Sequence, residues 1–160
     1  MKTNLCAFLV GIVVALGGGS AALAADAKES AVGTWTLNVA KSKFSPGPAP
    51  KSITRTYTQN AQGTTVKVEG VAADGSPISQ QSTYKYDGKD YPYTGTPNFD
   101  TLSVKQGDSR TVTFTLKKQG KVVGTGTRTL STDGKVLTLS SKLTDAKGTP
   151  SESVAVYDKQ

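Results

Sequence analysis

The chain contains no histidine, and its one cysteine, Cys6, lies close to the N-terminus. Histidine is the commonest general base and metal ligand of enzymes, and a cysteine thiolate is a frequent nucleophile. The chain therefore lacks the side chains that most acid–base, thiol and transition-metal catalysis requires. The strand glutamates, Glu69 and Glu152, have an outward phase, so the inward carboxylate pair of a glycosidase is missing too. We expect a protein that is not an enzyme and that needs no metal or cofactor.

Long apolar runs are also scarce, and the clearest one occupies residues 5–17. It follows Lys2, and it is too short and wrongly flanked for a membrane span. Ala22 and Ala24 supply the small-x-small pattern of a cleavage site. We predict that residues 1–24 are a signal peptide and that the mature protein is periplasmic or secreted, with no stable membrane insertion. An uncleaved membrane anchor is the alternative.

Cleavage after Ala24 also removes Cys6, which leaves a mature chain without disulfides. The remainder is long enough for one domain and not for two. We place a flexible leader at residues 25–31 and the domain at residues 32–160. The formal net charge of the full chain is +7, but its lysines are scattered. This pattern is typical of a solubilising surface, and we expect no nucleic-acid partner.

Turn-forming residues punctuate the chain about every dozen positions from Gly33 onward, which is typical of an antiparallel all-β domain. A meander of about eight to ten strands closes most easily into an up-and-down β-barrel, because closure removes exposed strand edges. Prolines within residues 41–51 predict a loop across one end, so we expect no helical lid. The predicted strands are Val32–Val39, Ser52–Gln59, Thr64–Val71, Ile78–Tyr86, Tyr91–Thr94, Thr101–Lys105, Arg110–Lys118, Lys121–Leu130, Lys135–Thr144 and Ser151–Asp158.

All the arginines share the strand phase of apolar residues, whereas the strand lysines fall out of phase. Residues two apart in a strand lie on the same face, so the predicted inner face carries guanidinium groups. Buried charge is costly unless it is paired, and these groups need internal partners or a ligand. Arginine, tyrosine and glycine do not fill a solid core, which favours a container wide enough for a small molecule.

Two short segments resemble those of the calycins, the superfamily of lipocalins and fatty-acid-binding proteins. Gly33-Thr34-Trp35 is similar to their Gly-x-Trp opening, and Val156-Tyr157-Asp158-Lys159 is similar to the last strand of fatty-acid-binding proteins. The resemblance is closest to uncharacterised bacterial secreted lipocalin-like proteins. It implies a ten-stranded barrel with Trp35 across the closed end, near a basic residue. It also implies a carboxylate site built on Arg-x-Tyr, but Ala155 stands where that arginine would be.

We predict an exported protein that binds a lipophilic or amphipathic molecule, anionic at one end, inside the barrel. Arg128 is interpreted either as the partner of Trp35 or as a ligand anchor, and Arg55 and Arg110 either as anchors or as structural residues that reach solvent. The alternative is an envelope interaction module or enzyme inhibitor that has a filled barrel and acts through its loops; no protein partner is identified. The predicted ligand-binding residues are Arg128, Arg55, Arg110, Tyr57, Tyr84, Tyr86, Phe114, Leu116, Leu137 and Leu139.

Overall fold

The computed structural model describes residues 30–145 and 147–160, so the predicted signal peptide lies outside the described residues. The described chain contains eleven strands and one short 3-10 helix. None of the described helices is long and apolar enough to cross a membrane. In chain order the elements are β1 (Gly33–Leu37), η1 (Val39–Lys41), β2 (Lys43–Ser45), β3 (Ser52–Asn60), β4 (Gly63–Val71), β5 (Pro77–Tyr84), β6 (Asp87–Thr94), β7 (Thr101–Gln106), β8 (Thr111–Lys118), β9 (Lys121–Leu130), β10 (Val136–Thr144) and β11 (Pro150–Lys159).

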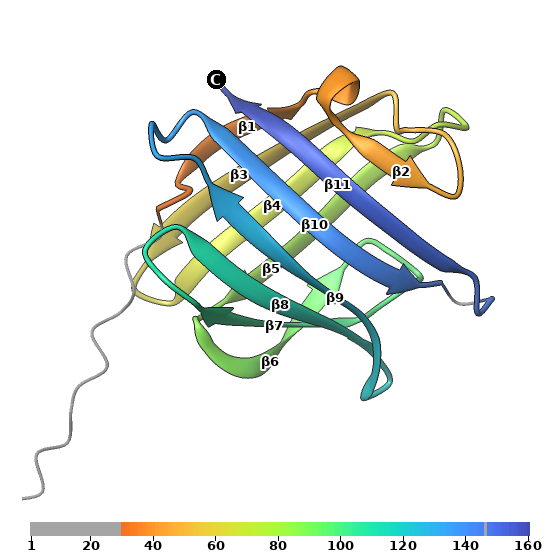
Figure 1. The fold of residues 1–160 in the computed structure, drawn as a ribbon. Coiled ribbons are helices and arrows are strands. Elements are labelled where there is room, and N and C mark those ends of the chain that lie inside the picture. The colour runs from red at the N-terminus through yellow and green to blue at the C-terminus, as the bar shows by residue number, and fades with distance from the viewer. Residues whose placement is uncertain (1–29, 146) are drawn as a thin grey trace, which may run out of the picture.

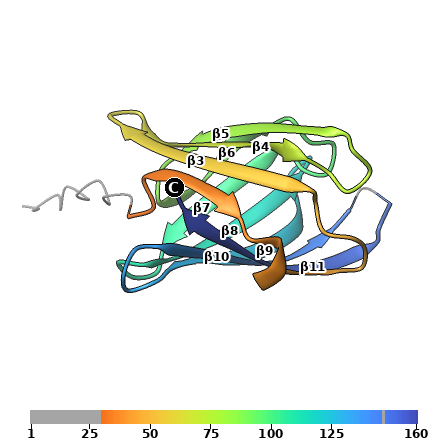
Figure 2. The same cartoon turned by 90° about the horizontal axis from the view of Figure 1, so that it is seen from above.

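The strands form one antiparallel sheet that closes on itself (Figure 1). From β3 to β11 each strand pairs with the next one along the chain, and β1 pairs with both β3 and β11. Ten strands thus make the barrel, and β2 is an additional short strand on β11. Seen from above, β3 to β5 form one wall and β10 and β11 lie across from them (Figure 2). The predicted all-β, up-and-down barrel is confirmed.

One end of the barrel is closed by the start of the chain. Trp35 and Ala31 are fully buried, and the indole N–H of Trp35 donates to the carbonyl of Ala31 at 2.8 Å. The ammonium of Lys159 lies 5.3 Å from the Trp35 ring centre, which is a cation–π distance. Ala31, which the sequence placed in a flexible leader, therefore packs in the core. The basic residue over Trp35 is Lys159, whereas Arg128 had been the candidate.

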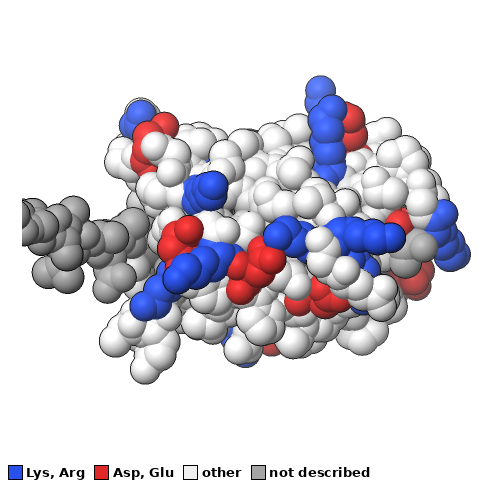
Figure 3. Space-filling view, turned by 90° about the horizontal axis from the view of Figure 1, so that it is seen from below, with Lys and Arg blue, Asp and Glu red and all other residues white. Residues whose placement is uncertain are grey.

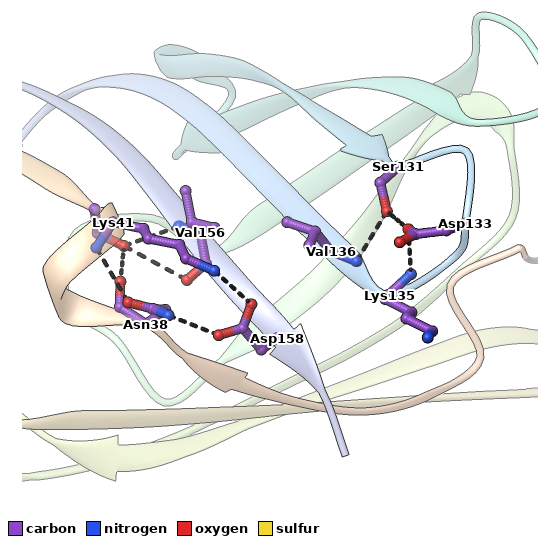
Figure 4. A network of polar contacts seen from close by, with 9 residues as sticks. Asn38, Lys41, Ser131, Asp133, Lys135, Val136, Val156 and Asp158 are labelled. Carbon is purple, nitrogen blue, oxygen red and sulfur yellow. Dashed lines mark hydrogen bonds and ion pairs between the residues drawn. The ribbon is translucent and has the colours of Figure 1, made fainter.

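β1, η1 and β2 together form one interrupted strand along β11. β1 pairs with the end of β11 and β2 pairs with its start, and residues 38–42 bulge out between them. The hydroxyl of Ser42 accepts a hydrogen bond from the backbone N–H of Val156 at 2.9 Å. It takes the place of the backbone carbonyl that a continuous neighbouring strand would offer to Val156. Asn38 donates to Asp158 at 2.6 Å and caps η1 (Figure 4). Residues 41–51, predicted as a plain loop, thus contain the short strand β2. It forms because β11 extends beyond β1, and this part of β11 has an edge with which β2 can pair.

The turns between strands are fixed by aspartates that accept local backbone N–H groups. Asp133 accepts from the backbone of Lys135 at 3.0 Å and from the hydroxyl of Ser131, which in turn accepts from the backbone of Val136 (Figure 4). Asp74, Asp108 and Asp145 hold other turns in the same way. Asp87 and Gly88 instead begin β6, at a bulge against β7.

The two faces of the last strand are now assigned. Ala155 and Tyr157 are buried on the inner face, at 6% and 1% exposure, while Val154 is 39% exposed on the outer face. The sequence had left this facing open, because the two valines favoured one phase and the tyrosine favoured the other. The inner phase follows from register, since Tyr157 lies opposite Leu137 and Leu37.

On the outer surface, basic and acidic side chains lie close to one another, as Figure 3 shows for one face. Lys117 contacts Asp90 at 2.8 Å, and Lys142 contacts Glu152 at 2.8 Å. Exposed pairs of this kind contribute little stability. Their mixed signs fit the interpretation of the lysines as a solubilising coat.

Candidate functional site

The barrel encloses a cavity of about 300 Å³, at the lower end of the range for small-molecule sites. Its lining comes from β2, from β3 to β11 and from the segment between β6 and β7. Seven of the predicted residues line it: Arg128, Arg55, Tyr57, Tyr84, Phe114, Leu116 and Leu139. Their roles as ligand contacts stay predictions, but the barrel brings these side chains together around one space.

Three predicted residues do not line the cavity. Arg110 is exposed in the turn before β8, where Asp108 accepts its backbone N–H at 2.8 Å, so its expected inward facing is wrong. Leu137 is fully buried, opposite Leu130 and Tyr157, and belongs to the packed core. Tyr86 follows the end of β5, and the guanidinium of Arg128 donates to its hydroxyl at 3.3 Å.

Several lining residues were not predicted as site residues. Phe44, Thr96, Asn98 and Phe99 come from β2 and from the irregular segment between β6 and β7, where no alternation signals an inward face. Gln80, Val112 and Leu143 could have been predicted, because strand alternation places them on the inward face of their strands. The remaining lining residues are Ile53, Val66, Tyr93, Leu102, Val104, Ser141, Ser153, Ala155 and Tyr157.

Arg55, on β3, is the charged group that defines the site. Its Nε donates to the hydroxyl of Tyr157 at 3.1 Å, and its guanidinium lies 5.4 Å from the centre of the Tyr157 ring. The side chain is surrounded by the barrel, yet it retains accessible surface because it faces the cavity. Among the described residues, no carboxylate forms an ion pair with Arg55.

Arg55 is a cation at neutral pH. Burial lowers its pKa and the neighbouring Tyr157, Tyr57 and Tyr93 raise it, so that the pKa of Arg55 lies above its ordinary value. Tyr157 offers the guanidinium a ring face and a hydroxyl group, neither of which is a counter-charge. The interior therefore holds a permanent cation whose hydrogen-bonding capacity is only partly used, since a guanidinium has five donor hydrogens.

Tyr93 extends the polar side of the cavity. Its hydroxyl donates to the side-chain carbonyl of Gln80 at 2.8 Å, and its ring packs on Phe99 with centres 4.7 Å apart. Burial raises the pKa of Tyr93 to about 12. Tyr93 is thus neutral at physiological pH and suited to hydrogen bonding rather than to proton transfer.

Arg128, on β9, belongs to an aromatic cluster. Its guanidinium lies 4.8 Å from the Tyr57 ring centre and contacts the hydroxyls of Tyr84 at 3.4 Å and Tyr86 at 3.3 Å. The side chain is 5% exposed, and Tyr84 and Tyr86 pack edge to face. These contacts fix Arg128 in the wall, which favours a structural contribution beside its place in the cavity lining.

Two inward glycines of β9 give space to neighbouring side chains. An ideal Cβ at Gly126 would lie about 2.4 Å from both the Phe114 ring and the Ser140 carbonyl, far closer than real Cβ contacts. A Cβ at Gly124 would meet Leu143 at 2.9 Å. The room predicted inside these glycines is therefore occupied by the Phe114 ring and the Leu143 side chain, which lie back against the wall and leave the centre open.

The described residues that line the cavity include no carboxylate, histidine or cysteine. Within the described part of the chain, no three His, Cys, Asp or Glu residues gather as metal ligands would. None of the carboxylates with lowered pKa values lines the cavity: Asp74, Asp87, Asp100, Asp108, Asp133, Asp145 and Asp158. The cavity lining contains two arginines, several phenols, two side-chain amides, three hydroxyl residues and an apolar remainder.

No family model matches the chain. The curated proteins contain no match to it either. Among solved structures, zebrafish ileal bile acid-binding protein complexed with cholic acid is 12% identical, with a TM-score of 0.48 over 82% of this chain and 100% of that one. A redesigned β-barrel, mFAP1, bound to DFHBI, is 14% identical, with a TM-score of 0.41 over 84% and 100%. Lobster apocrustacyanin A1 is 15% identical, with a TM-score of 0.41 over 82% and 61%.

At 12–15% identity the likeness is one of fold alone. What this chain binds has to be inferred from its own residues.

Proposed function

We propose that this protein binds one small amphipathic molecule inside the barrel and that Arg55 holds the anionic group of that molecule. The observation that carries the proposal is a cation facing a cavity, with Tyr157 as its hydrogen-bond partner and no ion-paired carboxylate among the described residues. Enclosing a charge costs several kcal/mol unless it is compensated. A cation–π contact and one hydrogen bond offset part of this, on the order of 2–4 kcal/mol. An anionic ligand would supply the remainder.

The anchor differs from the one that the calycin resemblance implied. Ala155 replaces the expected arginine on β11, but Arg55 reaches the matching Tyr157 from β3. The pair of arginine and tyrosine is thus retained with the arginine on another strand. Of the other two arginines, Arg110 is exposed outside the cavity, and Arg128 is fixed among phenols.

The cavity also limits the size of the ligand. A volume of about 300 Å³ corresponds to roughly ten water molecules. Close packing at protein density then allows a ligand of about 10 to 20 non-hydrogen atoms. Its apolar body would lie against Phe114, Leu116 and Leu139, and it would enter near Phe44 and the proline-rich segment at residues 46–51.

The test is the Arg55→Met variant, which removes the charge and keeps an apolar side chain of similar length. Decanoate is titrated calorimetrically into both proteins, with decanol as the uncharged counterpart. We expect the variant to bind decanoate at least tenfold more weakly, which is about 1.4 kcal/mol, and decanol equally well. Thermal stability should be equal or higher without ligand, because an enclosed charge is gone.

The matched control is Arg110→Met, which removes an exposed arginine outside the cavity. It should leave the affinity for decanoate unchanged. Equal decanoate affinity in the wild type and in Arg55→Met would show that Arg55 does not hold the anion.

The alternative of an interaction module assumed a barrel filled by side chains. The cavity removes that premise, and no described feature favours an inhibitor over a carrier. Export stays a proposal that rests on the predicted signal peptide at residues 1–24. N-terminal sequencing of the protein recovered from the cell envelope would test it, with Ala25 expected as the first residue.

A further inference from the structure

Two serines form a second polar spot in the apolar wall of the cavity. Ser141 on β10 and Ser153 on β11 lie directly opposite each other, and their hydroxyl oxygens are 2.9 Å apart. Both line the cavity and both are half-buried. On their two sides the same row around the barrel contains Gly126, opposite Ser141, and Phe44, opposite Ser153.

This position breaks the pattern of its strand. Along β10 the inward residues are Leu137, Leu139, Ser141 and Leu143. Ser141 is thus the one polar residue in a row of leucines. A serine inside an apolar wall does not contribute to burial as leucine does, and its hydroxyl needs a partner. The mutual hydrogen bond satisfies one donor only. One donor hydrogen and three acceptor lone pairs remain on the pair, with no other hydrogen bond from the described residues.

The serine pair lies at a defined distance from the cationic spot. Ser153 and Tyr157, the partner of Arg55, are four residues apart on β11 and share the inner face. The strand rises by about 3.3 Å per residue, which separates the two backbone positions by roughly 13 Å. Along β11 the cavity wall therefore has a cationic spot at Arg55 and Tyr157 and a hydroxylic spot at the two serines, with Leu139 and Ala155 between them. Arg128, Gln80, Thr96 and Asn98 are further polar residues of the lining.

The serine pair also lies close to water. Ser141, Ser153, Phe44 and Gly126 line an open groove on the outer side of the barrel wall, and the first three line the cavity as well. A polar group of a ligand would lose less hydration there than in the depth of the barrel.

We propose that Ser141 and Ser153 form a second ligand subsite, which hydrogen-bonds a hydroxyl or carbonyl group on the far part of the ligand. The ligand class is then an amphipathic acid that has its second polar group about ten or more ångströms from the anionic group. This inference rests on the proposed function, because the anionic group at Arg55 sets the orientation of the ligand.

The experiment compares decanoate, 10-hydroxydecanoate and 2-hydroxydecanoate as calorimetric probes. Extended, the first hydroxy acid places its hydroxyl far from its carboxylate, and the second places it beside the carboxylate. The wild type should bind 10-hydroxydecanoate roughly fivefold more tightly than decanoate, the gain expected from one hydrogen bond. The 2-hydroxy acid should show no such gain.

The Ser141→Ala/Ser153→Ala double variant should lose this preference, so that the ratio of the two dissociation constants falls to one or inverts. Removing both partners of a hydrogen bond leaves no unsatisfied group, so the variant should keep its melting temperature. The matched control is Ser140→Ala, one residue along β10 on the outer side, which should keep the fivefold ratio.

The outcomes separate the two proposals. If both acids bind with equal affinity, and the double variant changes neither affinity, the serine subsite is wrong while the anionic site stands. If neither acid binds the wild type, the proposed function fails and the subsite fails with it. If the preference persists in the double variant, the hydroxyl is recognised elsewhere and the serine subsite is again wrong.

Discussion

At the scale of single residues, the shape of the cavity depends on the absence of one side chain. Gly126 lies opposite Phe114 on β8 and opposite Ser141 on β10. Because it has no Cβ, the Phe114 ring lies back over the backbone of β9 instead of standing in the cavity. The position of the Phe114 ring, and with it the space left to a ligand, therefore depends on the missing side chain at Gly126.

Replacing Gly126 with alanine should destabilise the protein by about 1–3 kcal/mol, as overpacking does. The new methyl group would push the Phe114 ring inward, and it would also press on the fixed carbonyl of Ser140. Urea unfolding measures the first effect, and decanoate titration measures the accompanying loss of affinity. Thr127→Ala, on the outer side of the same strand, should change the free energy of unfolding by less than about 0.5 kcal/mol. An unchanged midpoint for Gly126→Ala would contradict this account.

The sequence predicted the residues of this site where the strand alternation is regular. Arg55, Tyr57, Phe114 and Leu139 were found because side chains two apart must share a face, whatever they contact. Arg110 was misassigned because Asp108 accepts its backbone N–H and keeps it in the turn, which phase alone does not reveal. Which arginine would meet Tyr157 depends on side-chain reach across the barrel, so it followed only from the structure.

At the scale of elements, the interruption between β1 and β2 shows what sequence patterns miss. The prolines correctly excluded a long strand over residues 41–51, but a three-residue strand has no periodicity to detect. It forms because β11 continues past β1 and presents an edge. Asn38 and Ser42 link the two halves by hydrogen bonds to β11 and to each other.

Asn38→Ala should therefore loosen this element without opening the barrel. The variant loses the hydrogen bond to Asp158 and the cap of η1, together worth about 1–2 kcal/mol. Hydrogen exchange should rise at residues 39–45 and stay constant in β4 and β8. Asn60→Ala, which removes a turn hydrogen bond to Gln62, is the control and should leave exchange at residues 39–45 unchanged. A uniform rise in hydrogen exchange for Asn38→Ala would show that the hydrogen bonds of Asn38 support the whole barrel.

At the scale of the whole molecule, stability below pH 8 should depend on pH in a single direction. The chain has no histidine, so no side chain has an ordinary pKa between pH 5 and 8. Asp74, Asp108, Asp133, Asp145 and Asp158 have lowered pKa values, because neighbouring N–H and O–H groups donate hydrogen bonds to them. A lowered pKa in the folded state means that these groups stabilise the fold above their unfolded value of 3.8 and lose this contribution below it.

The melting temperature should thus be nearly constant from pH 8 to pH 5 and should fall as the pH drops below about 4. Circular dichroism melts across this range measure it. Asp108→Asn keeps an acceptor oxygen but removes the titration, so it should make the fall at low pH shallower. A fall between pH 7 and pH 5 would point to a different titrating group.

The pairing of β11 with β1 and β2 also has a consequence for how the chain folds. Every other pairing except β1 with β3 joins consecutive strands, so most of the sheet assembles from local hairpins in chain order. The pairing of β1 with β11, which closes the barrel, joins residues more than a hundred positions apart, such as Leu37 and Tyr157. Until the last strand is in place, β1 and β10 expose unpaired edges, the kind of surface through which chains aggregate. Newly made protein should therefore be most vulnerable immediately before completion, and truncations within β11 should yield inclusion bodies rather than a smaller barrel.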